Sequence, residues 1–167
     1  MAGANNIKKS RPISLVGSVY KILTIVLTSR LRKVVGKVVS PNQHAFICGR
    51  QILDASSIAN ECMDLYLKSN QSGILYKLDI EKAYDNVSWS FLPATLEKMG
   101  FPSKWMSWMH FCMSIVRDSV LIKGESSGFF SSSRGLRPRD PLSPLLFILV
   151  METLNRLVNK AIDTGFF

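Results

Sequence analysis

Apolar residues recur every three or four positions in two stretches of the first half of the chain. This is the spacing of one face of an α-helix. The first stretch predicts a helix from near Ser14 towards Val39, which ends before Pro41 because proline cannot continue a helix. The second predicts a helix over Ile52–Lys68, with apolar side chains gathered on one side. The first half of the chain is therefore expected to be mainly helical.

The middle of the chain changes between short strand-like and helical patterns. Residues Ile74–Ile80 follow a Ser-Gly turn and are rich in apolar and aromatic side chains, which predicts a strand. Ser88 is placed to cap a helix that runs through Met99 and closes at Gly100. Pro102 suits the first turn of a further helix. This part is predicted to contain one strand and two helices.

The last third predicts a β-hairpin and a long helix. The runs Ser119–Lys123 and Gly128–Ser132 flank a Gly-Glu-Ser-Ser sequence and are expected to pair as antiparallel strands. A loop rich in Arg, Pro and Asp follows, and then a helix from about Ser143 to Asp163. Helices interleaved with antiparallel strands indicate an α+β fold. The length of 167 residues, without a linker-like segment, fits one domain.

Basic residues are concentrated at the start of the chain. The first fifty residues contain nine Lys or Arg and no Asp or Glu, whereas the rest carries twelve of each sign. Lys and Arg on a surface displace counterions from phosphates, so this distribution favours a polyanionic partner. A solvated cationic face without a partner is the alternative that charge alone leaves open.

The cysteines and the apolar segments indicate where such a chain resides. Cys48, Cys62 and Cys112 are odd in number and form no paired motif, which predicts neither a disulfide framework nor a zinc site. No signal-peptide pattern is present, and no apolar stretch is long and uncharged enough to cross about 30 Å of hydrocarbon. We therefore expect a soluble intracellular protein, nuclear or cytoplasmic, without a membrane partner.

A carboxylate stands at the end of the predicted strand over Ile74–Ile80. Asp79 lies there, and Glu81 follows on the next loop. A carboxylate at a strand's end can hold a divalent cation while the strand stays rigid. Asp79 can equally cap the next helix or pair with Lys77 or Lys82. The segment alone does not decide between these interpretations.

Three arginines and two early prolines make the loop RGLRPRDPLSP at 134–144 basic and stiff. Such a loop before a helix N-terminus can face phosphates. Arg11, in RPISL, places a similar basic residue at the start of the first predicted helix. For the loop at 134–144, an ordinary exposed turn with Asp140 or Ser143 as helix cap explains the same residues.

Six blocks of the chain, taken in order, resemble consecutive blocks of the reverse transcriptases of plant LINE-type (non-LTR) retrotransposons. The resemblance covers the chain from about Arg11 onward, and the order and spacing of the blocks make it specific. It implies an RNA-directed DNA polymerase with a right-hand fold, of which residues 1–73 resemble the fingers and 74–167 the palm and fingers. The blocks are RPISLVGSVYKILTIVLTSRL, SPNQHAFICGRQILD, KLDIEKAYDNVSWSFL, KMGFPSKWMSWMHFCMS, SVLIKGESSGFF and SRGLRPRDPLSPLLFILVMETLNRL.

The resemblance also implies roles for individual residues. Asp79 would be the first catalytic aspartate that binds Mg²⁺, and the backbone carbonyl of Ile80 would join that ligand set. Tyr84 would lie under the sugar of the incoming dNTP and exclude a 2′-hydroxyl. Arg11 would contact the triphosphate. An RNA template and a DNA primer or target are the implied partners.

The chain departs from the family's pattern in the Arg-rich loop. Where the family usually reads Arg-Gln-Gly-Asp, this chain has Pro138 and Arg139 in place of Gln and Gly. Pro138 has no N–H to donate, and Arg139 adds bulk where a glycine lets the backbone approach the nucleotide. We therefore expect a degenerate nucleotide pocket.

The family's second metal-binding motif, an Asp-Asp pair downstream of this loop, is not found in the chain. Two-metal phosphoryl transfer needs carboxylates from both motifs. We therefore expect a chain truncated before the Asp-Asp motif and inactive as a polymerase. The alternatives are a non-catalytic nucleic-acid-binding relic and a structural or interaction module. A magnesium phosphatase is disfavoured because Glu81 stands where such an enzyme needs a second Asp.

Overall fold

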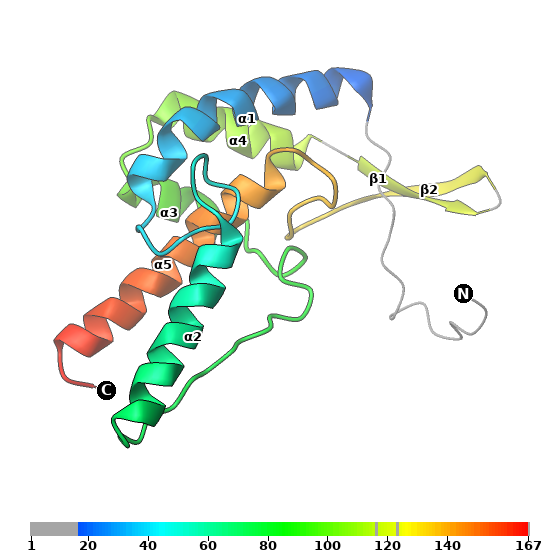
Figure 1. The fold of residues 1–167 in the computed structure, drawn as a ribbon. Helices are drawn as coiled ribbons and strands as arrows, with labels where there is room; N and C mark the ends of the chain where they lie inside the picture. The colour runs from blue at the N-terminus through cyan, green and yellow to red at the C-terminus, as the bar shows by residue number, and fades with distance from the viewer. Residues whose placement is uncertain (1–16, 116, 123, 167) are drawn as a thin grey trace.

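Helices and one β-hairpin make up the described part of the chain, residues 17–115, 117–122 and 124–166 of a computed structural model (Figure 1). Helices and an antiparallel sheet in one chain confirm the α+β fold class. In chain order the elements are α1 (Ser18–Val38), α2 (Ile52–Lys68), α3 (Phe91–Lys98), α4 (Ser103–Ser114), β1 (Arg117–Ile122), β2 (Glu125–Ser131) and α5 (Ser143–Asp163).

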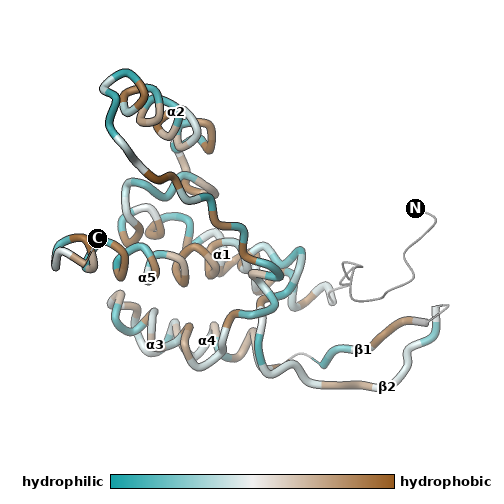
Figure 2. Tube along the Cα trace, turned by 90° about the horizontal axis from the view of Figure 1, so that it is seen from below, coloured by the Kyte–Doolittle hydropathy of each residue, from teal (hydrophilic) through white to brown (hydrophobic). Residues whose placement is uncertain are grey.

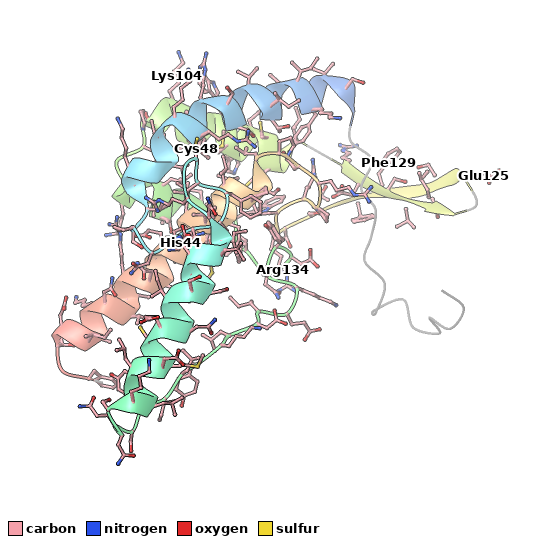
Figure 3. The ribbon with its side chains drawn as sticks, in the orientation of Figure 1. His44, Cys48, Lys104, Glu125, Phe129 and Arg134 are labelled. Atoms are coloured by element: carbon pink, nitrogen blue, oxygen red, sulfur yellow. The ribbon has the colours of Figure 1, made fainter. Side chains whose placement is uncertain are left out.

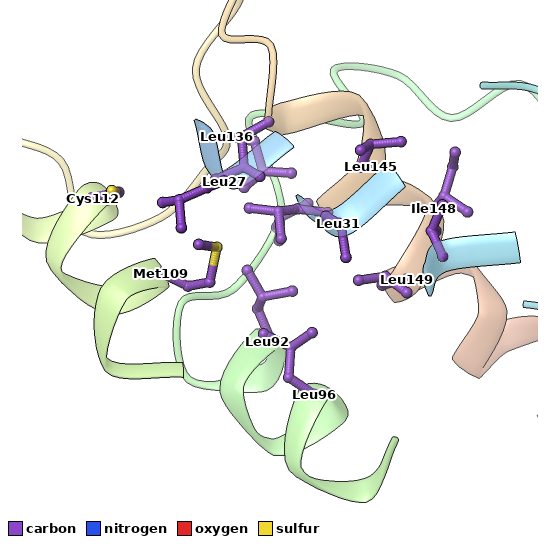
Figure 4. Close-up of a cluster of buried hydrophobic side chains, with 14 of the residues drawn as sticks. Leu27, Leu31, Leu92, Leu96, Met109, Cys112, Leu136, Leu145, Ile148 and Leu149 are labelled. Atoms are coloured by element: carbon purple, nitrogen blue, oxygen red, sulfur yellow. The ribbon is translucent and has the colours of Figure 1, made fainter. Parts of the chain in front are cut away.

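Four of the helices enclose the hydrophobic core. α1 and α3 pack on α5, and α4 packs on α3. Leu31, Leu92 and Leu149, one from each of α1, α3 and α5, are completely buried at the centre (Figure 4). Burial of each such side chain stabilises the fold by about 1.5–3 kcal/mol. The core draws on both sides of position 73, so the segments predicted as fingers and palm share it. The division itself stays a prediction.

α1 ends at Val38, one residue before the predicted end, while the predicted start near Ser14 lies outside the described residues. Two threonines, Thr24 and Thr28, are buried on its core face. The Thr28 hydroxyl donates to the Thr24 carbonyl at 2.6 Å, and the Thr24 hydroxyl donates to the Lys21 carbonyl at 3.2 Å. Because the helix backbone satisfies both hydroxyls, they are buried at little cost.

Arg50 holds the turn that follows α1. Its guanidinium donates to the carbonyl oxygens of Gly36 at 3.2 Å, Ser40 at 2.6 Å and Gln43 at 2.7 Å. The buried carboxylate of Glu152, in α5, accepts a hydrogen bond from the Ser40 N–H at 2.9 Å. These contacts fix the end of α1 against α5. Sequence pattern does not reveal them, because Ser40 and Glu152 are far apart along the chain.

α2 spans Ile52–Lys68 as predicted, yet none of its residues is buried. Its exposed apolar side chains include Leu53 and Leu67, which is 78% exposed. In Figure 2 the tube of α2 lies apart from α1, α3, α4 and α5, and the segment after it carries further hydrophobic residues. The apolar spacing that predicted the helix is therefore correct, but in this chain it does not face the core.

The strand predicted over Ile74–Ile80 is wrong. This segment has no regular secondary structure, and its apolar side chains are exposed, with Ile74 at 81%. A strand requires a neighbouring strand to accept and donate its backbone hydrogen bonds. Among the described residues the only sheet is β1–β2, and no strand runs beside this segment. Although the segment has the composition of a strand, it has no partner strand, so its backbone N–H and C=O groups are left to water.

The helices of the second half begin and end close to their predicted positions. The Ser88 hydroxyl accepts hydrogen bonds from the N–H groups of Ser90 and Phe91, at the start of α3. Gly100, at φ +83°, follows the end of α3, and Pro102 precedes the first residue of α4. α5 has the predicted bounds. Within the described residues, no helix combines the length and apolar character needed to span a membrane.

The β-hairpin is confirmed, but its turn is tighter than predicted. Ile122 pairs with Glu125, so Gly124, at φ +89°, lies in the turn. The Glu-Ser-Ser sequence that was predicted to lie in the connection belongs instead to β2, where Ser126 pairs with Leu121. A glycine at positive φ suits a tight hairpin turn, and this shifts the start of β2 towards the N-terminus.

Candidate active site

Two segments that are far apart in the sequence are joined by backbone hydrogen bonds. One follows Asp79 and contains Tyr84, and the other is the start of the Arg-rich loop. The Leu136 N–H donates to the Tyr84 carbonyl at 2.8 Å, and the Gly135 N–H donates to the Val87 carbonyl at 2.8 Å. In return, Trp89 Nε1 donates to the Gly135 carbonyl at 2.7 Å. The segment 84–89 and the loop 134–136 are therefore one structural unit.

Gly135 is required at the centre of this unit. Its φ is +91°, and a Cβ at this position would lie 3.0 Å from the carbonyl oxygen of Asp85. A side chain would therefore meet both a strained backbone conformation and a backbone atom that has little freedom to move. The sequence analysis gave no role to this glycine in the Arg-Gly-Leu sequence, although it is the residue that allows the close approach.

Tyr84 is held from its other side by α5. Its ring stacks on the ring of Phe147, with 4.9 Å between the ring centroids. The tyrosine is half-buried, and burial raises the pKa of its hydroxyl, so the side chain stays neutral at physiological pH. The aromatic ring is thus fixed in place by packing as well as by the backbone on either side of it.

Asp140 is a buried carboxylate that sequence analysis treated as a helix cap. The Tyr20 hydroxyl, from α1, donates to its Oδ2 at 2.7 Å, and the Leu142 N–H donates to its Oδ1 at 3.0 Å. Burial and then this hydrogen bond raise the pKa of Tyr20 well above its ordinary value. The second contact lies just before α5, whose N-cap is Leu142 without a side-chain capping bond, so neither Asp140 nor Ser143 is the cap. The first, which joins α1 to the Arg-rich loop, has no sequence signal because 120 positions separate the partners.

Arg137 connects the same loop to the β-hairpin. Its guanidinium lies over the Tyr20 ring, 5.2 Å from the centroid, and its Nε is 3.9 Å from Asp118 Oδ1 in β1. The other carboxylate oxygen of Asp118 accepts a hydrogen bond from the Ser132 hydroxyl at 2.8 Å. Arg137 Nη1 is buried and lacks a hydrogen-bond partner among the described residues. Arg137 therefore serves internal contacts, whereas the sequence left open a loop that faces phosphates or an ordinary exposed turn.

Comparison with known proteins shows the family of the chain. Residues 3–167 match the family model described as reverse transcriptase (RNA-dependent DNA polymerase), which is nearly the whole chain. The chain belongs to the reverse transcriptase family. The resemblance that the six sequence blocks carry is thereby confirmed at the level of the family.

Several relatives of this reverse transcriptase chain come from non-LTR retrotransposons. It is 30% identical over 152 residues to the Pol polyprotein of the R2DM retrotransposable element of Drosophila melanogaster, which covers 91% of the chain and 14% of that protein. It is 29% identical over 154 residues to an uncharacterized 149 kDa protein of transposon TX1 from Xenopus laevis, covering 92% and 12%. The chain thus spans about an eighth of the length of these relatives.

A shorter match is to a plant protein. An uncharacterized mitochondrial protein of Arabidopsis thaliana is 49% identical over 45 residues, which is 27% of this reverse transcriptase chain and 37% of that protein.

The remaining predicted site residues are not part of the joined segments as the structure describes them. Asp79 and Ile80 are exposed in the irregular segment that leads to Tyr84. Arg11 lies outside the described residues. The structure thus brings Tyr84 together with the Arg-rich loop and leaves Asp79 on an exposed segment nearby in sequence. The roles predicted for these residues stay predictions.

Pro138 and Arg139 occupy the loop where the family usually has Gln and Gly. Arg139 is exposed and has a φ of +64°, which is a left-handed conformation that glycine adopts without strain. The backbone at Arg139 therefore has a conformation that suits glycine better than arginine.

The metal-binding capacity of the described residues is small. Asp79 and the Ile80 carbonyl supply oxygen ligands, the kind that Mg²⁺ prefers. The Asp79 carboxylate is exposed, and no described residue engages it in a hydrogen bond or an ion pair. No group of three or more His, Cys, Asp or Glu side chains in the described residues is placed to hold a metal. The ligands are right in kind but too few for a complete Mg²⁺ site.

Proposed function

We propose that this chain forms the fingers and part of the palm of a reverse transcriptase from a plant LINE-type retroelement. The observation that carries the proposal is the hydrogen-bonded junction between segment 84–89 and loop 134–136. In this proposal Asp79 and the Ile80 carbonyl contribute ligands to Mg²⁺, Tyr84 faces the sugar of a dNTP, and Arg11 faces its triphosphate. An RNA template and a DNA primer or target are the partners.

The fixed position of Tyr84 supports its proposed role. A residue that discriminates against a 2′-hydroxyl must present a rigid surface, because a movable ring makes room for the extra atom. Phe147 packs on the Tyr84 ring, and the Leu136 N–H binds the Tyr84 carbonyl. The partial match to a plant protein supports the plant origin, and the matches to R2 and TX1 proteins support the non-LTR class.

In this proposal the chain binds nucleic acid and supplies only the first of the two sets of carboxylates that a two-metal site needs. Since no Asp-Asp pair occurs in its 167 residues, the second set of carboxylates would have to come from elsewhere. By itself, the chain then acts as a nucleic-acid-binding module, the alternative that its basic residues favour. Arg30, Lys33 and Lys37 recur at helical spacing on the exposed side of α1, and no described carboxylate pairs with them.

Binding of a fluorescently labelled RNA–DNA primer–template tests the proposal. We expect binding that weakens steeply with salt, by about 0.9 in log affinity per log unit of salt for each duplex phosphate contacted. Replacement of Lys33 and Lys37 by Gln should reduce this slope. The matched control replaces Glu61 and Asp64 of α2 by Gln and should leave the slope unchanged or increase it. No binding at low salt, or an affinity that does not change with salt, would reject a nucleic-acid partner.

A further inference from the structure

The segment 74–80, Ile-Leu-Tyr-Lys-Leu-Asp-Ile, has the composition of a strand and a free backbone edge. No backbone N–H or C=O group of residues 74–79 makes a hydrogen bond to another described residue. In Figure 3 its side chains stand as sticks along the ribbon that leads from the end of α2 to the region of the labelled Arg134. Tyr76 and Leu78 are each at least 78% exposed. The segment therefore offers both unpaired backbone groups and apolar side chains to a partner.

The side chains of this segment alternate in character. Successive side chains of an extended chain point to opposite faces. The four residues at even positions from 74 to 80 are all apolar and would share one face. The odd positions are Leu75, Lys77 and Asp79, so the opposite face carries one charge of each sign. An extended copy of the segment thus has one apolar face and one face with a positive and a negative charge.

Two copies of the segment match each other as antiparallel strands in the register centred on Leu78. Lys77 of each copy then lies opposite Asp79 of the other, and Tyr76 lies opposite Ile80. Moving the centre by one position places either Lys77 opposite Lys77 or Asp79 opposite Asp79, and like charges directly opposite each other are unfavourable. In the Leu78 register the Lys77–Asp79 pair forms twice, because twofold symmetry repeats every contact.

α2 adds the apolar surface that two strands alone lack. A two-stranded sheet is marginally stable in water unless a helix or further strands pack on it. No residue of α2 is buried, and its exposed apolar side chains include Leu67 near its end. Segment 74–80 begins close to this end, since a Cβ on Gly73 would lie 3.2 Å from the Tyr66 ring. α2 is therefore placed to support the paired segments.

We propose that two copies of this chain associate through segment 74–80, paired as antiparallel strands about Leu78 and supported by α2. The partner is a second copy because the charges of the segment complement each other in this register. The pairing does not rest on the proposed function. It does bear on it, because the Asp79 carboxylate cannot serve both Lys77 of the second copy and a metal ion.

Exchange of the two charges tests the pairing. Sedimentation velocity of the full chain over a range of concentrations gives the dissociation constant of the dimer. In Lys77→Glu, and separately in Asp79→Lys, like charges oppose each other twice, so we expect a dissociation constant about ten-fold higher. The double variant restores opposite charges and should dimerise like the unmodified chain. The matched control, Lys98→Glu, makes the same charge change at an exposed position of α3 and should leave the dissociation constant unchanged.

A disulfide measures the register directly. Leu78→Cys places the new cysteines of the two copies opposite each other, with their Cα atoms about 4.5–5.5 Å apart, a distance that a disulfide spans. The matched control is Tyr76→Cys, whose two copies lie four residues apart, about 13 Å. The exposed Cys48 and Cys62 are replaced by Ser in both variants. Mild oxidation should link Leu78→Cys into a covalent dimer and should link Tyr76→Cys far less.

A monomer at every concentration would overturn the proposal, as would equal association of the unmodified chain and both single charge variants. Weakening in the single variants without recovery in the double variant, or equal cross-linking of the two cysteine variants, would overturn the Leu78 register and with it the proposed interface. None of these results depends on nucleic-acid binding, so the proposed function is tested separately.

Discussion

The Tyr20 hydroxyl and the Asp140 carboxylate form the polar contact that joins α1 to the Arg-rich loop. Asp140 is 6% exposed, and its two oxygens accept hydrogen bonds from Tyr20 and from the Leu142 N–H. A carboxylate removed from water is stable only when such donors replace the water. Loss of the Tyr20 donor would leave Asp140 with one of these two partners, so the tyrosine has an importance that its position in a helix does not suggest.

We predict that Tyr20→Phe lowers the free energy of unfolding at pH 7 by about 1.5–3 kcal/mol, the contribution of a hydrogen bond to a charged group. The pKa of Tyr20 is raised above its ordinary value of 10.0 in the folded chain, so ionisation favours the unfolded state. The stability that Tyr20 contributes is present below pH 10 and is lost as the pH rises above it. Urea unfolding from pH 7 to pH 11 measures this.

The unmodified chain must be compared with Tyr20→Phe at each pH. Tyr84 and Cys112 also have raised pKa values, and they lower the stability of both proteins at alkaline pH. The difference in unfolding free energy between the unmodified chain and Tyr20→Phe should shrink as the pH rises above 10. A difference that stays constant between pH 7 and pH 11 would show that the Tyr20 hydroxyl is not buried against Asp140.

Arg139 is a position where the backbone conformation and the residue type conflict. Its φ of +64° costs a non-glycine residue about 1–2 kcal/mol, whereas glycine adopts it freely. Glycine loses about 0.5–1 kcal/mol more in chain entropy on folding. We therefore predict that Arg139→Gly raises the free energy of unfolding by roughly 0.5–1 kcal/mol, as measured by urea unfolding.

The control for this prediction is Arg134→Gly. Arg134 belongs to the same loop and is also exposed, but it does not have a positive φ. There glycine brings only its entropic cost, so the variant should be less stable than the unmodified chain. If both glycine variants are destabilised by similar amounts, Arg139 does not have the left-handed conformation.

The join between segment 84–89 and loop 134–136 depends on a glycine, and this can be tested. We predict that Gly135→Ala lowers the free energy of unfolding by about 1–3 kcal/mol, because the added Cβ is strained and meets the Asp85 carbonyl. Gly124→Ala is a matched control: its φ of +89° is close to the +91° of Gly135, but no atom lies within 4 Å of its added Cβ.

The difference between these two alanine variants therefore isolates the contact with Asp85 from the strain that they share. Gly135→Ala should be the more destabilised in thermal or urea unfolding, and its Trp89 fluorescence should change as the bond to the Gly135 carbonyl is disturbed. Equal destabilisation of the two variants would mean that the loop does not approach segment 84–89 as closely as described.

Elements whose signals are local were predicted well from the sequence. The bounds of α2 and α5 follow from apolar spacing and from the prolines and glycines beside them, and the Ser88 hydroxyl acts at the start of α3 as its position suggests. The strand over Ile74–Ile80 failed because strand formation depends on a neighbour, which no local pattern encodes. The turn of the hairpin was misplaced because the three residues after Gly124 belong to β2 and not to the turn.

The candidate site was predictable only in part, because several of its contacts join residues that are far apart along the chain. The family resemblance identified Tyr84 and the Arg-rich loop, and their proximity is seen in the structure. Chemistry alone did not single out Tyr20 or the burial of Asp140 and Arg137, because each acts through a partner more than a dozen positions away. Exposure of Asp79 is a consequence of the missing strand and was not predicted either.

The exposed apolar surface of α2 and segment 74–80 has a consequence for the isolated chain. Leu53, Leu67 and Leu78 are each more than 70% exposed, and apolar surface of this kind favours association. We predict that the chain forms concentration-dependent oligomers in sedimentation velocity. Leu53→Lys with Leu67→Lys should shift the distribution towards monomer.

A control for added charge is Ser69→Lys with Gln71→Lys, which places two lysines at exposed polar positions beside the same surface. It should leave association nearly unchanged. A monodisperse monomer at all concentrations would show instead that α2 and segment 74–80 are stable while exposed to water.

RNA-templated primer extension tests most directly the claim that this chain carries one half of a polymerase site. The chain is incubated with an annealed RNA–DNA primer–template, Mg²⁺ and dNTPs, and extended primers are counted. Because Asp79 is the proposed first metal ligand and no Asp-Asp pair accompanies it in the sequence, we predict no incorporation above the background of Asp79→Ala. Extension by the unmodified chain that disappears in Asp79→Ala would contradict this claim and show that the 167 residues hold a complete site.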